Sequence, residues 1–196
     1  MNKQEFLDQD RLTRGEIRTM EEWWRLAKSK NFTLRMHVAE RKDAPVEIIE
    51  YLLEDEFFPV AETAMANPVL PSEAIERKLK SELYISFNMQ NSIAKNPNTP
   101  PRILEKLSKP IGETIRSSVA RNPSTPAETL ENLSNIDNYV VLSALVENPN
   151  LPDEILLKLS FSRFAVIREM ATGRIMKRFD PEWKVDESVI GNLFVE

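Results

Sequence analysis

Apolar residues recur along the chain at the spacing of amphipathic helices, in two sets that alternate. The first set is an i, i+4 pair, found at Leu34/Val38, Val60/Ala64, Met89/Ile93, Ile115/Val119 and Val141/Leu145. The second set is an i, i+3 pair at Ile49/Leu52, Leu104/Leu107, Leu130/Leu133 and Leu156/Leu159, with Ile75/Leu79 displaced by one position. Both spacings keep apolar side chains on one helical face, and no alternating strand pattern competes with them. The pattern predicts an all-α chain built from units of about 26 residues with two short helices each.

An Asn-Pro-x-x-Pro motif separates the two predicted helices of a unit. The motif recurs at steps of 29, 26 and 26 residues, at Asn67, Pro68 and Pro71, at Asn96, Pro97 and Pro100, at Asn122, Pro123 and Pro126, and at Asn148, Pro149 and Pro152. A step of 26 residues back from Pro71 reaches Pro45, where Arg41 and Lys42 replace Asn-Pro. A fifth unit is therefore predicted there.

The residue types of this motif suit a turn between two helices. Asparagine tolerates the left-handed conformation that ends many helices, and a proline after it cannot extend the helix. The second proline has a φ that suits a helix start, with Thr99, Thr125 or Ser72 nearby as a capping oxygen. We therefore expect the asparagines to be structural helix ends. The weaker alternative is that the asparagine side chains line a binding groove and form hydrogen bonds with a partner.

The two ends of the chain contain degenerate units. Residues 1–33 are predicted to form an N-terminal capping region, in which Thr19 and Glu22 make a capping box before a helix with Trp23 and Leu26 on its apolar face. Residues 34–162 hold the tandem units. Residues 163–196 are predicted to hold a degenerate last unit and a C-terminal cap, whose Trp183, Val185, Ile190, Leu193 and Phe194 could cover the last unit. The whole is predicted to be one continuous domain, an α-solenoid of about five and a half units.

The clearest units, VARNPSTPAETLENLS and SIAKNPNTPPRILEKLS, resemble those of the leucine-rich repeat variant family. The resemblance covers about residues 34 to 160 and continues more weakly to about 178. It implies a right-handed helical solenoid similar to HEAT and armadillo arrays. It implies no enzymatic activity and no catalytic residues. The type example of the family also has an amino-terminal iron-sulfur module, whose cysteines are absent here.

Composition excludes several kinds of chemistry. The 196 residues include no Cys and one His, His37, which excludes disulfides, thiolate metal sites and thiol catalysis. No combination of nucleophile, base and orienting group can be assembled, and a carboxylate-pair hydrolase has no spacing signal. We therefore expect no catalytic residue, no cofactor and no metal. No apolar stretch is long enough to span a bilayer and the first residues are polar, so we expect a cytoplasmic protein without membrane contact.

Several polar side chains occupy equivalent positions in the predicted helices. Such positions would lie about 10 Å apart along a stack of helices and form rows on one face. The candidate partner-binding residues are Arg35, Gln90, Lys95, Arg116, Arg121, Arg168, Arg174 and Trp24. The alternative is a solvated face in which the arginines pair with neighbouring carboxylates. The other aromatic residues, including Phe32, Phe57, Phe58 and Phe87, are expected to fill the core.

Binding is the leading function that these observations leave. A helical array offers a long contact face, which favours a non-catalytic protein-protein interaction module or regulator. The alternative is a nucleic-acid backbone binder of the helical-repeat DNA glycosylase type, which the net charge of −5 disfavours. Charge is segregated, because residues 40–56 are mainly acidic and residues 163–178 mainly basic. We therefore expect a monomer, a weak head-to-tail assembly or a homodimer.

Overall fold

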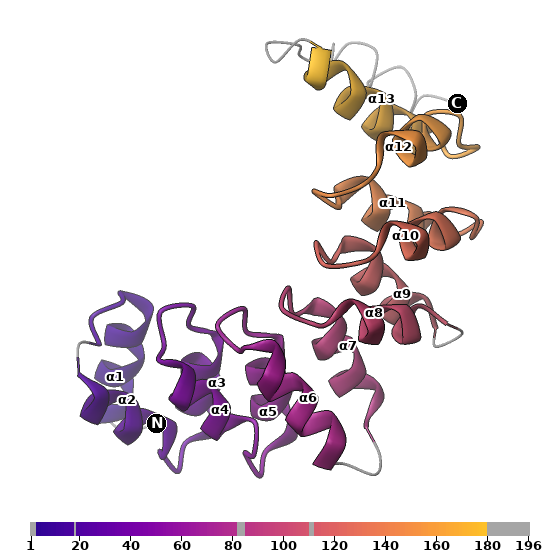
Figure 1. Ribbon diagram of the computed structural model, residues 1–196. Helices are drawn as coiled ribbons and strands as arrows, with labels where there is room; N and C mark the ends of the chain where they lie inside the picture. Colours follow the sequence, from indigo (N-terminus) through magenta and orange to yellow (C-terminus); the bar gives the residue numbers. More distant parts are fainter. Residues whose placement is uncertain (1–2, 18, 82–84, 110–111, 180–196) are drawn as a thin grey trace.

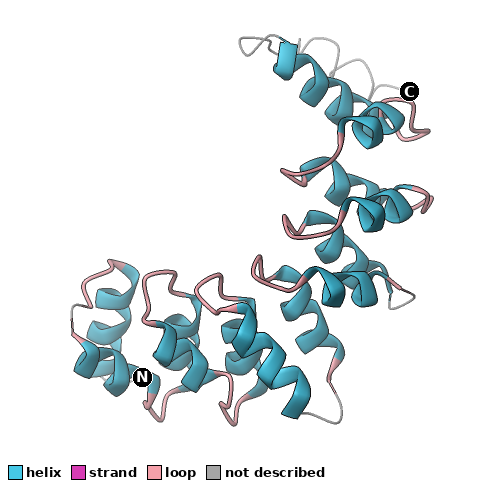
Figure 2. Ribbon diagram, viewed as in Figure 1, coloured by secondary structure: helices cyan, strands magenta, loops and turns pink. Residues whose placement is uncertain are grey.

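The computed structural model describes residues 3–17, 19–81, 85–109 and 112–179, which form thirteen helices and no strand (Figures 1 and 2). The all-helical prediction is confirmed. The helices are α1 (Lys3–Thr13), α2 (Met20–Ala27), α3 (Phe32–Glu40), α4 (Val46–Leu52), α5 (Phe58–Ala66), α6 (Ser72–Ser81), α7 (Phe87–Lys95), α8 (Pro101–Ser108), α9 (Gly112–Arg121), α10 (Ala127–Ser134), α11 (Tyr139–Glu147), α12 (Asp153–Leu159) and α13 (Ala165–Phe179).

The helices pack in two rows that run along the molecule. Each odd-numbered helix packs on the next odd-numbered one, from α1 to α13. In the other row α2 packs on α4, α8 packs on α10, and α10 packs on α12. The molecule is elongated, and its direction changes where α6 is followed by α7 and α8 (Figure 1).

The core lies between the two rows, where the sequence places its apolar pairs. Every residue of the i, i+4 set is buried, from Leu34 and Val38 to Val141 and Leu145. The i, i+3 set is buried as well, except for the displaced Leu79, which is half-buried against the core. These positions are buried because each short helix has one apolar face, which is removed from water only by the neighbouring helices.

The asparagine before each turn proline adopts an extended backbone rather than the expected left-handed one. Asn67, Asn96 and Asn148 have φ of −69°, −71° and −65° and ψ between 123° and 128°. The described residues include no non-glycine residue with a positive φ. The left-handed prediction is wrong because the ring of the following proline restricts the preceding residue to the extended region. The helix therefore ends because ψ of the asparagine changes from the helical to the extended value, while φ stays negative.

The side chains of these asparagines bind the backbone of the preceding unit, and we call this set of contacts the asparagine ladder. Asn122 Nδ2 donates to the carbonyl oxygens of Ala94 and Asn96, both at 2.7 Å, and Asn122 Oδ1 accepts from Ser124 N at 2.8 Å. The same three bonds recur at Asn67, Asn96 and Asn148. All four side chains are buried. Each amide therefore uses its hydrogen-bonding groups inside the protein.

The ladder continues past the last Asn-Pro motif through an arginine. Arg174 lies 26 residues after Asn148, and its guanidinium donates to the carbonyls of Val146 and Asn148, the latter at 2.7 Å. These two carbonyls correspond to those that asparagine binds in the earlier units. Burial lowers the pKa of Arg174 from its ordinary value. Arg174 was a candidate for binding a partner, but its guanidinium group has a structural role.

The second proline of the motif lies one residue before the next helix. Pro100, Pro126 and Pro152 have φ between −59° and −56° and ψ between 139° and 146°, and none receives a side-chain cap. Thr99 and Thr125 face the other way, and their hydroxyls donate to the carbonyls of Ile93 at 2.5 Å and Val119 at 2.6 Å. The predicted capping role of these threonines is therefore wrong. They satisfy carbonyls at the end of the preceding helix, where intrahelical donors run out.

The N-terminal end contains the predicted helix α2 and a further helix, α1. The capping box of Thr19 and Glu22 is formed, and Trp23 is buried as expected. The preceding α1, which the sequence did not predict, packs on α3. Its buried Asp8 accepts two hydrogen bonds from Arg25, at 2.6 and 2.8 Å. The predicted C-terminal cap lies outside the described residues, while the predicted helix of the last unit is α13.

The ladder predicts the stability of an asparagine variant. Asn122→Ala removes two donated bonds and one accepted bond and leaves the buried carbonyl of Ala94 without its donor, while the carbonyl of Asn96 keeps its bond from Thr99 N. We expect the free energy of unfolding to fall by about 3 kcal/mol. Urea denaturation followed by circular dichroism measures it. Asn132→Ala, an exposed position on α10, is the control and should change it by less than about 0.5 kcal/mol. Equal effects of the two substitutions would contradict a structural role for the ladder.

The Asp8–Arg25 pair predicts a dependence on pH. The hydrogen bonds from Arg25 hold the pKa of Asp8 below its ordinary value. The stabilisation is therefore complete above the unfolded-state pKa of about 3.9 and is lost as the pH falls through the lower folded-state pKa. We expect the wild-type protein to be more stable than Asp8→Asn at about pH 7 and the difference to shrink towards about pH 2. Urea titrations at several pH values test this, and a pH-independent difference would refute it.

Candidate functional site

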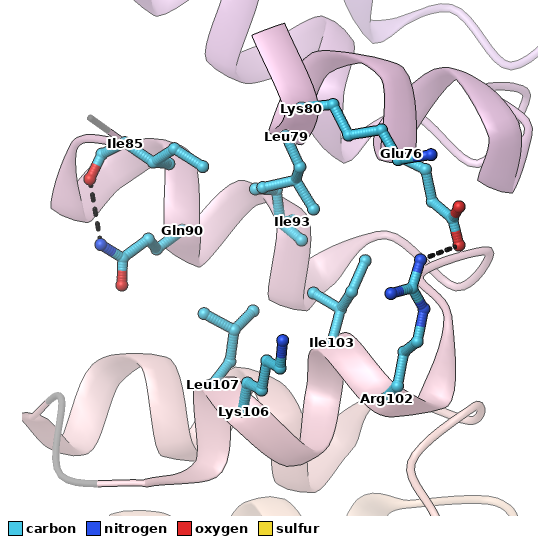
Figure 3. Close-up of a pocket in the computed structure, with 10 residues that line it drawn as sticks. All are labelled: Glu76, Leu79, Lys80, Ile85, Gln90, Ile93, Arg102, Ile103, Lys106 and Leu107. Carbon is cyan, nitrogen blue, oxygen red and sulfur yellow. Dashed lines mark hydrogen bonds and ion pairs between the residues drawn. The ribbon is translucent and has the colours of Figure 1, made fainter. Parts of the chain in front are cut away.

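A cleft of about 560 Å³ lies between α6 and α8, above α7, where the stack changes direction (Figure 3). We call it the α6–α8 cleft. Its apolar walls come from Leu79 on α6, Ile93 on α7, Ile103 and Leu107 on α8, and Ile85. Its polar lining comes from Glu76, Lys80, Gln90, Arg102 and Lys106. The cleft coincides with the 29-residue step, because α6 has ten residues whereas α4 and α12 have seven.

The cleft exposes residues that the other units cover. Ile103 is 9% exposed, whereas Ile48 and Ile155 at the equivalent positions are 0% and 2% exposed. Leu107 is 8% exposed, whereas its equivalents, such as Leu133, are nearly inaccessible. These differences arise because α6 and α8 diverge, while α8 packs on α10. The α6–α8 cleft is therefore a local opening in the core.

Charged side chains surround the apolar walls. Arg102 on α8 forms an ion pair with Glu76 on α6 at 2.7 Å, which lowers the pKa of Glu76 (Figure 3). Lys80 and Lys106 are exposed on opposite walls, and neither has an ion pair with a residue that the structure describes. The rim thus carries three cations and one carboxylate in a chain whose net charge is −5.

Gln90 is the one candidate binding residue that lines this cleft. Its Nε2 donates to the carbonyl of Ile85 at 3.0 Å. Its Oε1 is buried and has no hydrogen-bond partner among the described residues. Buried side-chain oxygens normally have a partner, because leaving one unpaired costs about 1 to 3 kcal/mol. Gln90 therefore leaves one buried acceptor unpaired beside the cleft.

The other polar residues at the helix position of Gln90 have structural contacts. Arg35 is buried, donates to the carbonyl of Ser29 at 2.7 Å and forms two bonds with Asp55 at 2.6 and 2.9 Å. Arg168 donates to the carbonyls of Ser162 and Arg163. Gln90, Arg35 and Arg168 thus each bind the loop that precedes their own helix. Their recurrence in the sequence is explained by this contact, and Arg35 is not on an accessible face.

The remaining candidates are dispersed. Arg116 is half-buried, and its Nε has no hydrogen-bond partner in the described part of the chain. Arg121 is exposed and pairs with Glu147 at 2.6 Å, while Lys95 is exposed. Trp24 is half-buried, with its ring 5.2 Å from that of Tyr51 and Lys28 above it. These side chains do not form one basic row with Arg35 and Arg174, whose guanidinium groups are occupied within the protein.

A row of exposed aromatic residues follows the odd-numbered helices and was not predicted. Its members occupy one position of the repeated units and begin α3, α5, α7 and α11 or lie in the first turn of α1. They are Phe6, Phe32, Phe58, Phe87 and Tyr139, with exposed fractions of 60, 47, 76, 46 and 44%. We call this set the aromatic row. The prediction that Phe32, Phe58 and Phe87 fill the core is wrong, because their position precedes the buried i, i+4 pair of each unit.

Neighbouring aromatic side chains support members of the row. Phe57 lies 4.5 Å from Phe32 and Phe164 lies 5.7 Å from Tyr139, measured between ring centroids. Phe87 lies against Gly112, which has a φ of +68° and where a Cβ would lie 3.7 Å from the Phe87 ring. The sequence does contain a signal for this row, because its five residues share one register. A search for apolar pairs alone does not detect it.

Comparisons with known proteins give no relative. No family model matches the chain, and no curated protein and no solved structure matches it. Among the described residues, no group of three or more His, Cys, Asp and Glu side chains is placed to hold a metal ion. None of the helices in the same residues is long and apolar enough to cross a membrane.

The contacts of two arginines predict different effects of their removal. Arg35→Ala leaves the nearly inaccessible Asp55 carboxylate without its partner, so we expect the free energy of unfolding to fall by about 3 kcal/mol or more. Arg121→Ala breaks an exposed pair and should cost less than about 1 kcal/mol. Urea denaturation of both variants measures the two effects. A small effect at Arg35 would mean that this side chain is free for another role.

Proposed function

We propose that the protein is a non-catalytic protein-binding module, built as a right-handed α-solenoid of two-helix units of about 26 residues. The resemblance of its units to the leucine-rich repeat variant family supports this architecture, as do the contacts of the asparagine ladder between residues 26 to 31 positions apart. In such an architecture most side chains serve stacking, and the residues that remain form long surfaces.

The aromatic row is the observation that supports binding. Aromatic side chains bury large apolar areas and are enriched at the centres of protein interfaces. Isolated exposed apolar residues are ordinary on a soluble protein, but a set that recurs in register on α1, α3, α5, α7 and α11 is not isolated. Phe58 is 76% exposed and Phe6 is 60% exposed, so neither contributes much to the core. Their apolar area is available to a partner.

The charges near the row favour a protein over a nucleic acid. The loop before α5 carries Glu56 and Glu54, the latter paired with Lys78, and the loop before α11 carries Asp137, which is paired with Arg163. A nucleic-acid backbone would require cations at these places. The arginines that a nucleic-acid binder would use include Arg35 and Arg174, whose guanidinium groups bind Asp55 and backbone carbonyls.

The proposal predicts the loss of a protein partner when the row is changed. The tagged protein is purified from its native cells with nuclease treatment, as wild type and as Phe6→Ser/Phe58→Ser. We expect a stoichiometric protein partner with the wild type and at least about a tenfold lower recovery with the variant, because interface aromatics commonly contribute 2 kcal/mol or more.

Leu157→Ser is the matched control, because Leu157 is 56% exposed on α12 and lies outside the row. It should retain the partner, and all variants should unfold at the wild-type urea concentration. Recovery of the same partner with the row variant would refute the role of the row. Recovery of nucleic acid without protein when the nuclease is omitted would refute the proposed class of partner.

A further inference from the structure

We propose that the α6–α8 cleft binds an acidic amphipathic helix of a partner protein. None of the residues of the aromatic row lines the cleft, so this interaction is tested independently of the row.

The apolar walls of the cleft fit one face of a helix. Leu79 stands on one wall, Ile103 and Leu107 stand on the other, and Ile93 forms the floor between them (Figure 3). Two helices that diverge over a third leave a groove of the kind that receives an amphipathic helix through side chains at i, i+3, i+4 and i+7. A bound helix would cover Ile103 and Leu107 in the way that neighbouring helices cover the equivalent residues of other units, such as Ile155 and Leu133.

The charges of the rim select an acidic helix. Lys80 and Lys106 are on opposite walls without an ion pair among the described residues, and Arg102 is paired with Glu76. A helix seated between the walls would place its flanking positions beside both lysines, so carboxylates there complete two ion pairs. Exposed pairs contribute little affinity each, but they determine which partner is accepted and make binding sensitive to salt. A basic helix would instead meet three cations.

The unpaired oxygen of Gln90 adds a polar group at the side of the cleft. Its Oε1 is buried at the side of the cleft near Ile85 and lacks a partner in the described part of the chain. The interior N–H groups of a helix are occupied, whereas those of its first turn are free. A helix that enters with its first turn near Gln90, or with a serine or threonine there, supplies the missing donor.

Fluorescence anisotropy with three labelled 18-residue peptides tests the proposal. The first carries leucines at i, i+3, i+4 and i+7 and glutamates on the flanking positions. The second has lysines in place of the glutamates, and the third has the composition of the first in a scrambled order. We expect the wild-type protein to bind the acidic amphipathic peptide at least about tenfold more tightly than either of the others. Equal affinities for the acidic and scrambled peptides would overturn the proposal.

Charge reversal locates the binding. Lys80→Glu/Lys106→Glu should weaken the binding of the acidic peptide at least about tenfold and improve that of the basic peptide. The matched control is Lys30→Glu/Lys42→Glu, which changes the net charge equally at exposed positions outside the cleft and should stay within about twofold of the wild type. Both double variants should keep the helical circular dichroism of the wild type. Equal weakening by both variants would show a general charge effect and would overturn the site.

Two further measurements separate the alternatives. Phe6→Ser/Phe58→Ser should bind the acidic peptide as the wild type does, so failure of the peptide assay leaves the proposal for the aromatic row unaffected. Sedimentation of the protein alone tests whether a second copy fills the cleft. Self-association that Lys80→Glu/Lys106→Glu abolishes would identify a second copy as the occupant and would overturn the assignment to another protein.

Discussion

The hydrogen bonds of the buried asparagine amides determine how one pair of helices sits on the next. A helix leaves carbonyls without donors at its end, and the proline of each motif removes a further N–H from the turn. Asn122 Nδ2 donates to the carbonyl of Ala94, at the end of α7, and to that of Asn96, which also accepts from Thr99 N. Its own turn is closed by the bond from Ser124 N to Asn122 Oδ1. One side chain therefore makes hydrogen bonds to its own turn and to the preceding one, which links consecutive pairs of helices.

This constraint explains why the long unit opens the molecule on one side. Asn96 follows the 29-residue step, yet its Nδ2 still donates to the carbonyls of Met65 and Asn67, at 2.7 and 2.8 Å. The ladder is thus unbroken along the odd-numbered helices, and α7 packs on both α5 and α9. The extra length lies in the other row, where α6 is ten residues long and diverges from α8. A fixed contact on one side and a longer helix on the other produce the change of direction and the cleft together.

The sequence predicts the helices and their buried faces because these depend on local spacing. The i, i+4 pairs, the capping box at Thr19 and Glu22, and the burial of Trp23 follow from periodicity and helix-cap chemistry. The asparagine ladder does not, because its acceptors lie 26 to 31 residues away and are backbone atoms without a side-chain signal. The helix α1 is missed because most of its residues are polar, so it shows no clear apolar periodicity. One of its contacts is the buried Asp8–Arg25 pair, which the sequence pattern does not reveal. The role of Arg35 is missed for the same reason, since Asp55 becomes its partner only when α3 and the loop before α5 meet.

A residue type can recur in the sequence because it stabilises the fold or because it belongs to a proposed binding surface. Arg35, Gln90 and Arg168 recur because each donates to the loop before its own helix. The aromatic row recurs in the same register at the start or in the first turn of five odd-numbered helices, and its members are 44 to 76% exposed. The ladder and the apolar pairs would hold the helices with a smaller or polar residue at that position, as Glu113 of α9 and Ala165 of α13 indicate. Phe6 and Phe58, the most exposed members, add little to the fold in water, so their repetition along the odd-numbered helices supports the proposed contact with another molecule.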